Sequence, residues 1–168
     1  MSGDYAFVAN ENGLVSIDIS DPSAPVIMGE YETEEVSYYI AVDGYYAYLT
    51  RLGYGMDIIN VSDPTSPSLV SSLDGINSPR DIRFSNEYIY MADAADGLVI
   101  VDVSDRSTSV VTGSFDEVGS ATAVDVRGAT AYVISYLELL YRQTFLCQIR
   151  QSTLRHTGDL LQQFLIPT

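Results

Sequence analysis

Most residues that could carry chemistry in this chain are carboxylates. The 168-residue sequence holds 23 acidic side chains against eight basic ones, and all eight are arginines. Part of the acidic set recurs in the spacing Asp-x-Ser-Asp or beside it: Asp18, Asp21, Asp63, Asp102 and Asp105. This spacing resembles part of a calcium loop, but the loop glycine and the bidentate glutamate of an EF-hand are absent. We therefore expect these carboxylates to accept backbone hydrogen bonds in Asx turns.

The chain has one cysteine, Cys147, and one histidine, His156, nine residues apart. A Cys–His nucleophile pair is formally possible, but a zinc site would need further ligands of these types. The sequence also lacks a nucleophile elbow, a phosphate-binding loop, a dinucleotide-binding glycine motif and an H-E-x-x-H helix. We therefore predict no catalytic residue, no metal and no cofactor.

The net charge of −15 restricts the classes of partner. Binding to nucleic acid requires a basic footprint, so we exclude it as a function. The acidity can serve solubility, a cation-rich or high-salt environment, or a basic partner. The longest apolar runs fall short of the ~20 residues of a membrane span, and no signal peptide is visible in this chain.

A repeat of 42 residues must position these groups, and it runs from Tyr5 to about Tyr136. The segment 13–22 returns as 55–64 and again as 97–105, each beginning with glycine and ending in a Ser-Asp turn. A period of this size indicates a blade-by-blade or a solenoid architecture.

Each unit contains the pattern of four short strands. In the second unit we predict strands over 38–42, 46–50, 56–61 and 69–73. Asp43-Gly44 separates the first two and is a strong hairpin signal, because glycine tolerates a positive φ. We expect an antiparallel sheet from every complete unit.

Apolar columns recur between units and indicate that the small sheets pack face to face. One column holds Phe7, Tyr48, Tyr90 and Tyr132, and another holds Ile19, Val61 and Val103. Four-stranded units of this length, repeated around an axis, are typical of β-propeller blades. We predict an all-β, propeller-like array of about three four-stranded antiparallel blades in an incomplete ring; a β-solenoid is the alternative.

The string Leu98-Val99-Ile100-Val101-Asp102, with looser copies at 14–18 and 56–60, resembles the signature of the LVIVD-repeat β-propeller family. The Ser-Asp-Pro turns that begin at Ser20 and Ser62 strengthen the resemblance. It implies a surface or exported prokaryotic protein, often part of a larger chain, with no shared catalytic residues. We therefore expect an extracellular or cell-surface location.

The repeat is incomplete at both ends, which divides the chain into a partial propeller over 1–136 and an off-pattern tail over 137–168. On the repeat register, the first blade lacks its inner strand. The sequence up to Tyr136 carries 21 acids and five arginines, and the tail two acids and three arginines. We expect the tail to be helical or disordered, and the open blade edges to permit self-association. A truncation or a reading-frame slip near Tyr136 is the alternative origin of the tail.

Loops that share one rim of such a propeller collect acidic residues, and clustered like charge focuses an electric field. These acids are Glu11, Glu32, Glu34, Glu35, Asp74, Asp93, Asp96, Asp116 and Glu117. Arg80, Asp81 and Arg83 depart from the repeat on the inner strand of the third blade. Local ion pairing and solvated loop charge are the competing interpretation.

Three functions remain open at this point. The first is a non-enzymatic scaffold that binds a protein or a glycan. The second is a propeller hydrolase or lyase with a channel site at Arg80 and Asp81, and the third is a fragment without independent function. The candidate binding residues are Glu34, Glu35, Asp74, Arg80, Asp81, Asp93 and Asp96.

Overall fold

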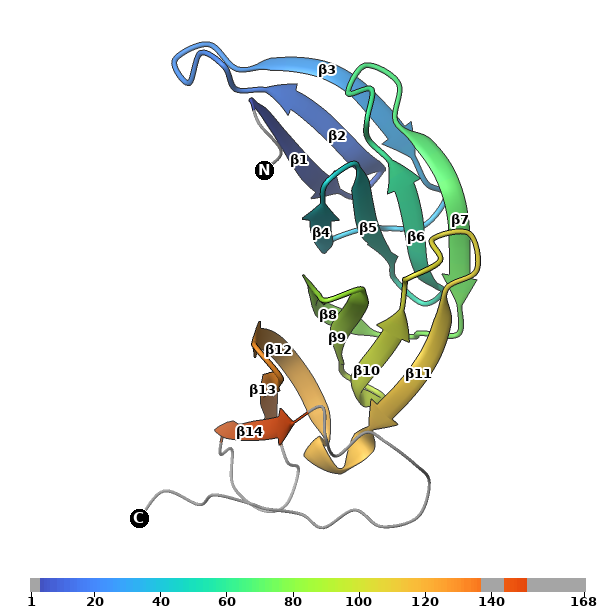
Figure 1. The fold of residues 1–168 in the computed structure, drawn as a ribbon, viewed down its shortest axis with the longest axis vertical. Coiled ribbons are helices and arrows are strands. Elements are labelled where there is room, and N and C mark those ends of the chain that lie inside the picture. Colours follow the sequence, from blue (N-terminus) through green and yellow to red (C-terminus); the bar gives the residue numbers. More distant parts are fainter. Residues whose placement is uncertain (1–3, 137–143, 151–168) are drawn as a thin grey trace.

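The computed structural model describes residues 4–136 and 144–150, and they form four antiparallel sheets that follow one another along an open arc (Figure 1). We number these sheets blades I to IV. Blade I contains β1 (Tyr5–Asn10), β2 (Gly13–Asp18) and β3 (Val26–Glu32). Blade II contains β4 (Ile40–Asp43), β5 (Tyr46–Arg51), β6 (Gly55–Asn60) and β7 (Ser68–Asp74). Blade III contains β8 (Pro79–Ser85), β9 (Tyr88–Asp93), β10 (Gly97–Asp102) and β11 (Val110–Phe115). Blade IV contains β12 (Ser120–Arg127), β13 (Thr130–Tyr136) and β14 (Thr144–Arg150), after a short 3-10 helix, η1 (Asp116–Val118).

The predicted fold class is confirmed: the described residues form propeller-like antiparallel blades. In Figure 1 the strands β4, β8 and β12 lie on the concave side of the arc, and β3, β7 and β11 on the convex side. Blade I has no inner strand among the described residues, as the repeat register predicted. None of the helical segments among the described residues could span a lipid bilayer.

The prediction for the tail was wrong at Thr144–Arg150, which forms a strand. This segment, β14, pairs antiparallel with β13 along its whole length, from Tyr136 opposite Thr144 to Thr130 opposite Arg150. Without β14, the outer edge of β13 would expose unpaired N–H and C=O groups, and any extended segment can satisfy them whatever its side chains. The other residues predicted to be helical or disordered, with His156 among them, lie outside the described residues.

The hydrophobic core consists of three layers, one between each pair of neighbouring blades. Leu14 packs with Leu49 and Ile59 between blades I and II. Between blades II and III, the ring of Tyr48 stacks on that of Phe84 with 5.6 Å between centroids. The layer between blades III and IV is built from these residues: Tyr90, Ala92, Leu98, Ile100, Val118, Ala121, Val124, Ala131 and Val133. The recurring columns of the sequence are therefore the contacts between blades.

The glycine that opens each repeat motif is required by a close approach of two strands. Gly13, Gly55 and Gly97 have φ of 136°, 155° and 73°, a region that side chains disfavour. A Cβ atom on any of them would overlap the carbonyl oxygen of Tyr31, Leu73 or Phe115, respectively, on the adjacent outer strand. The repeated glycine thus permits the two outermost strands of blades I, II and III to pair.

The turn that follows β6 or β10 docks on the two outermost strands of the blade before it. The Ser16 hydroxyl donates to the carbonyl oxygen of Pro64, and the Ser71 hydroxyl donates to that of Arg106 at 2.6 Å. Gly29, on β3, leaves room for this docking, because a Cβ there would lie 2.7 Å from the carbonyl oxygens of Pro64 and Thr65. Each turn therefore links two blades.

Candidate functional site

The recurring aspartates are structural, as the sequence predicted. The backbone N–H of Ser20 donates to Asp18 at 2.8 Å, and that of Ser104 donates to Asp102 at 2.9 Å. Asp105 accepts from the Ser107 backbone at 2.9 Å, and equivalent bonds form at Asp21 and Asp63. Hydroxyl and backbone N–H donors together lower the pKa values of all five carboxyl groups. The hydroxyls of Ser23, Thr65 and Ser107 are the main cause of the lower pKa at Asp21, Asp63 and Asp105, and the backbone N–H groups are the main cause at Asp18 and Asp102. Within residues 4–136 and 144–150, no three His, Cys, Asp or Glu side chains gather as metal ligands would.

Asp93, which was predicted to line the rim, is buried and holds a loop together. Its carboxylate accepts the backbone N–H groups of Ser78 and Ala95, each at 2.7 Å, and that of Asp96 at 3.0 Å. A carboxylate with three backbone donors fixes the connection between β9 and β10. Asp93 therefore does not face the rim, while Asp96 is half-buried beside it.

The most extensive polar cluster surrounds Arg51, which sequence reasoning missed. Its Nε lies 2.8 Å from Asp57 Oδ1, and one of its Nη atoms lies 2.6 Å from Asp74 Oδ1. Its other Nη is 3.8 Å from Glu35 Oε2. The side chains of Arg51 and Asp57 are only 11% and 5% exposed, so this is a buried ion pair with two flanking carboxylates. Glu35 and Asp74, two predicted binding residues, are thus already paired within the protein.

Asp57 extends the Arg51 cluster into blade I. It accepts hydrogen bonds from the Tyr31 hydroxyl at 3.1 Å and from the Ser72 hydroxyl at 2.7 Å. Burial, together with the charge of Asp57, raises the pKa of Tyr31 to about 12. A signal for this cluster exists in the sequence, because the same column holds Val15 in blade I and Val99 in blade III. A single charge in an apolar column indicates a buried partner.

The inner-strand charges of blade III form a local network. The Asp81 carboxylate accepts the backbone N–H of Ile82 at 2.9 Å, that of Val124 at 3.1 Å and Arg83 Nη1 at 2.6 Å. Both of its oxygens are therefore engaged. Arg80 is exposed at the register shift between Pro79 and Asp81. The predicted channel pair of Arg80 and Asp81 is thus divided between an exposed cation and a carboxylate that joins two blades.

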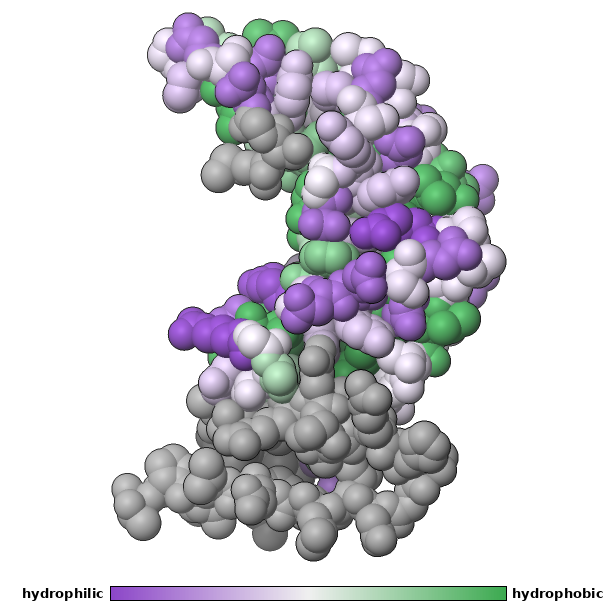
Figure 2. Space-filling view, in the orientation of Figure 1, coloured by the Kyte–Doolittle hydropathy of each residue, from purple (hydrophilic) through white to green (hydrophobic). Residues whose placement is uncertain are grey.

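Exposed aromatic and acidic side chains gather on the rim of blade II, and we call Glu34, Tyr38, Leu52, Tyr54 and Asp74 the blade II rim patch. Tyr38, Leu52 and Tyr54 are 51%, 39% and 53% exposed, and Glu34 and Asp74 are exposed beside them. In Figure 2 the coloured part of the visible face mixes hydrophilic side chains, in purple, with smaller apolar patches, in green.

Backbone hydrogen bonds hold the loop of this patch between the two neighbouring linkers. The N–H of Leu52 donates to Val36 at 2.9 Å, and the N–H of Gly75 donates to Tyr54 at 2.8 Å. Gly53 donates to Asn77 at 3.0 Å. Together with the ion pairs of Arg51, these bonds place the loop from β5 to β6 beside the segments that carry Glu34 and Asp74.

Solved structures show the same architecture at low sequence identity. The computationally designed Ika4 protein superposes with a TM-score of 0.67 at 10% identity, over 89% of this chain and 88% of that one. The designed Ika8 protein gives the same TM-score and identity over 92% of this chain and 45% of its own. A chain of the nidogen/laminin complex matches with a TM-score of 0.57 at 14% identity, over 80% of this chain and 52% of that one. This chain thus spans about half the length of the last two, and the likeness establishes the fold alone.

No curated protein matches the sequence significantly. The profile of the LVIVD repeat matches three segments, 1–33, 37–75 and 78–117, which correspond to blades I, II and III. Because these matches cover well over half of its residues, this chain belongs to the LVIVD-repeat family.

Proposed function

We propose that this repeat scaffold is a non-catalytic binding module of a surface or exported protein, and that it binds its partner through the blade II rim patch. The observation that carries the proposal is the exposure of Tyr38, Leu52 and Tyr54 on one rim. Tyrosine is enriched at protein interfaces, because its ring buries a large area while its hydroxyl keeps a hydrogen bond.

The charge of the patch favours a basic partner. Glu34 and Asp74 flank the tyrosines, and the whole chain carries a net charge of −15. Long-range attraction would speed the encounter with a lysine- or arginine-rich segment, while the aromatic contacts would set the lifetime of the complex. A peptide segment of a protein partner therefore fits better than an acidic glycan.

The patch is held in place before any partner binds. Arg51 pairs with Glu35, in the linker between β3 and β4, and with Asp74, at the end of β7. A surface that is ordered in advance loses less conformational entropy on binding. This arrangement supports a recognition role for the patch that Arg51 holds in place.

Selection from a random peptide display library tests the proposal. The native chain should enrich peptides that contain lysine or arginine beside apolar residues. Tyr54→Ala should abolish that enrichment, whereas Tyr45→Ala should preserve it. Tyr45 is a matched control, since it is 66% exposed and lies in the turn from β4 to β5, at the opposite end of β5.

Two results would contradict the proposed function. One is equal enrichment by the native chain and the Tyr54→Ala variant, which would place binding elsewhere. The other is binding on a glycan array that survives Tyr54→Ala, combined with no peptide enrichment. The surface or exported location is tested separately, by fractionating the source cells and detecting the chain with an antibody.

A further inference from the structure

We infer that two copies of this chain associate head to tail, with blade IV of one copy seated on the free face of blade I of the other. The two arcs then close into one ring. The inference is independent of the blade II rim patch and rests on three features: an uncovered apolar face, its counterpart at the other end of the chain, and complementary charges.

The free face of blade I carries the same columns that are buried in blades II and III. These residues are Ala6, Val8, Val15, Ile17 and Ile19. Their equivalents in blade II are Ala47, Leu49, Asp57, Ile59 and Val61, and those in blade III are Ile89, Met91, Val99, Val101 and Val103. All ten equivalents are at most 4% exposed, because each set faces the preceding blade. In blade I none of the five is buried, and Val8 is 43% exposed.

The opposite end of the chain carries the other half of this junction. Tyr132 and Ile134 of blade IV occupy the columns of Tyr90 and Ala92, which are 2% and 0% exposed where blade IV covers them. Ile134 is 38% exposed. At the junction of blades I and II, the equivalents of Ile134 and Val8 are Ala9 and Leu49, which belong to one core layer. The two ends are therefore the two halves of an interface that the protein already builds three times.

Charges at the two ends are also complementary. Between blades II and III, Asp43 lies 3.4 Å from Arg106, whose guanidinium also stacks 4.9 Å from the centre of the Tyr46 ring. Blade IV has Arg127 in the column of Asp43, and its side chain is 79% exposed. In blade I, the turn that would meet it carries Asp21 next to Pro22, where blade III carries Asp105 next to Arg106. The junction would thus bring an arginine of one end near a carboxylate of the other, with the signs exchanged relative to Asp43 and Arg106. In the single chain, Arg127 pairs with Asp125 at 3.0 Å and Asp21 accepts from Ser23.

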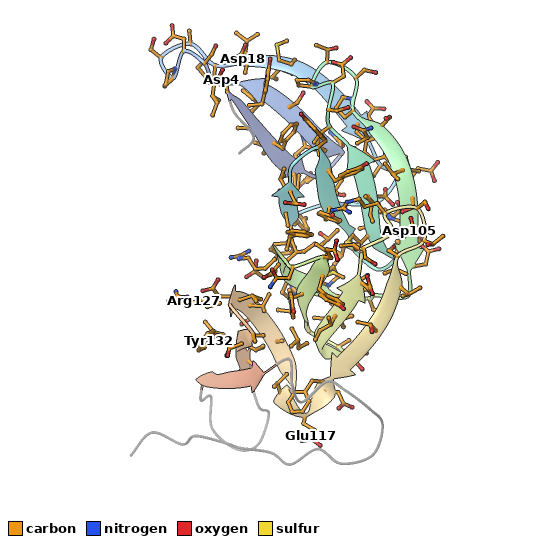
Figure 3. The ribbon with its side chains drawn as sticks, in the orientation of Figure 1. Asp4, Asp18, Asp105, Glu117, Arg127 and Tyr132 are labelled. Carbon is orange, nitrogen blue, oxygen red and sulfur yellow. The ribbon has the colours of Figure 1, made fainter. Side chains whose placement is uncertain are left out.

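The shape of the arc permits both junctions to form at once. Figure 3 places Asp4 and Asp18 at the free end of blade I, and Arg127 and Tyr132 at the free end of blade IV, on the same open side of the arc. A twofold axis through that opening generates two identical junctions and closes the assembly. This chain covers 45% of the designed Ika8 protein, so two copies together approach the length of that propeller.

The net charge of −15 on each copy opposes this association. Salt screens the repulsion between copies over distances beyond about 10 Å at 0.1 M. We therefore expect the dimer to strengthen as sodium chloride is raised, the reverse of an association driven by ion pairs alone.

Sedimentation equilibrium of the full chain, from micromolar to millimolar concentration, tests the inference. The measured mass should be twice the monomer mass of 18.4 kDa at high protein concentration.

Val8→Glu should weaken the dimer by about 30-fold or more, since it buries an unpaired carboxylate in the junction. Val26→Glu is the matched control, because Val26 is 57% exposed on β3, and it should leave the dimer unchanged. Circular dichroism of each variant verifies that it is folded.

Disulfide trapping distinguishes head-to-tail pairing from other arrangements. In a Cys147→Ser background, a mixture of Val8→Cys and Ile134→Cys chains should form the mixed disulfide on mild oxidation. A monomer at every concentration, or a dimer that Val8→Glu and Val26→Glu affect equally, would overturn the inference. So would a predominance of Val8–Val8 cross-links in the mixture, or chains of copies that lengthen with concentration instead of stopping at two.

Discussion

Asp81 on β8 accepts a hydrogen bond from the backbone N–H of Val124 on β12, at 3.1 Å, so one carboxylate joins the inner strands of two blades. The same residue accepts from Ile82 and Arg83 within its own strand. A charge that interrupts the repeat on an inner strand thus serves the junction between blades III and IV.

Asp81→Ala should lower the free energy of unfolding by about 1–3 kcal/mol, because it leaves the N–H of Val124 without an acceptor. Asp81→Asn should have a smaller effect, since the amide oxygen can still accept that bond. Urea denaturation measures both values. As a control, Asp125→Ala removes only an exposed ion pair with Arg127 and should stay within about 0.5 kcal/mol of the native chain.

Arg51→Met should destabilise the protein by about 3 kcal/mol or more, because it leaves the buried Asp57 carboxylate without its cation. Adding Asp57→Val should restore much of the loss, since valine occupies the same column at Val15 and Val99. A double-mutant cycle by urea denaturation measures the coupling. Additive effects of the two substitutions would show that Arg51 and Asp57 do not act as a pair.

Tyr31 should make the protein sensitive to alkali in a defined range. Its folded-state pKa of about 12 lies above the ordinary value of 10.0, so the folded state retains a proton that the unfolded state releases. Its contribution to stability is complete below pH 10 and is lost as the pH rises from 10 towards 12. Tyr31→Phe should flatten the pH dependence of the urea midpoint in this range. Tyr45→Phe, at an exposed position, serves as the matched control.

Gly29→Ala should destabilise the protein by about 1–3 kcal/mol through steric overlap between blades. The added Cβ would lie 2.7 Å from the carbonyl oxygens of Pro64 and Thr65, so blade II would have to shift. Thermal unfolding with a calorimeter measures the change. Ser71→Ala, in the same column of blade II, should lose only one hydrogen bond to Arg106 and provides the comparison. Native stability of Gly29→Ala would contradict the docking described here.

The periodic part of the structure could be predicted from the sequence. The columns of Tyr48 and Val61 predicted which faces of the blades pack. Each blade packs against similar blades, so equivalent positions of the repeat are buried in the same way. The Ser-Asp turns were also predictable, since Asx hydrogen bonds are local. By contrast, the strand β14 could not be predicted from residues 144–150, because backbone pairing with β13 needs no sequence motif.

The candidate site was predictable only in part. The positions of Glu34 and Asp74 on one rim follow from the register, but the burial of Asp93 does not. Whether a loop carboxylate faces solvent or turns back to the N–H groups of its own loop depends on local dihedral angles, which the sequence leaves open. Arg51 was missed because its partners, Glu35, Asp57 and Asp74, come from three segments that are brought together only by folding.

The hydrogen bond from Tyr31 to Asp57 also has a consequence for how the chain reaches this arrangement. Blades I, II and III share most of their apolar columns, so a nascent blade I could dock on blade III almost as well as on blade II. In that misordered state the Tyr31 hydroxyl would face Val99, which offers no acceptor, and Asp57 would lose a donor. The polar pair therefore favours the correct order of the blades over the misordered one, because only the correct order satisfies both groups.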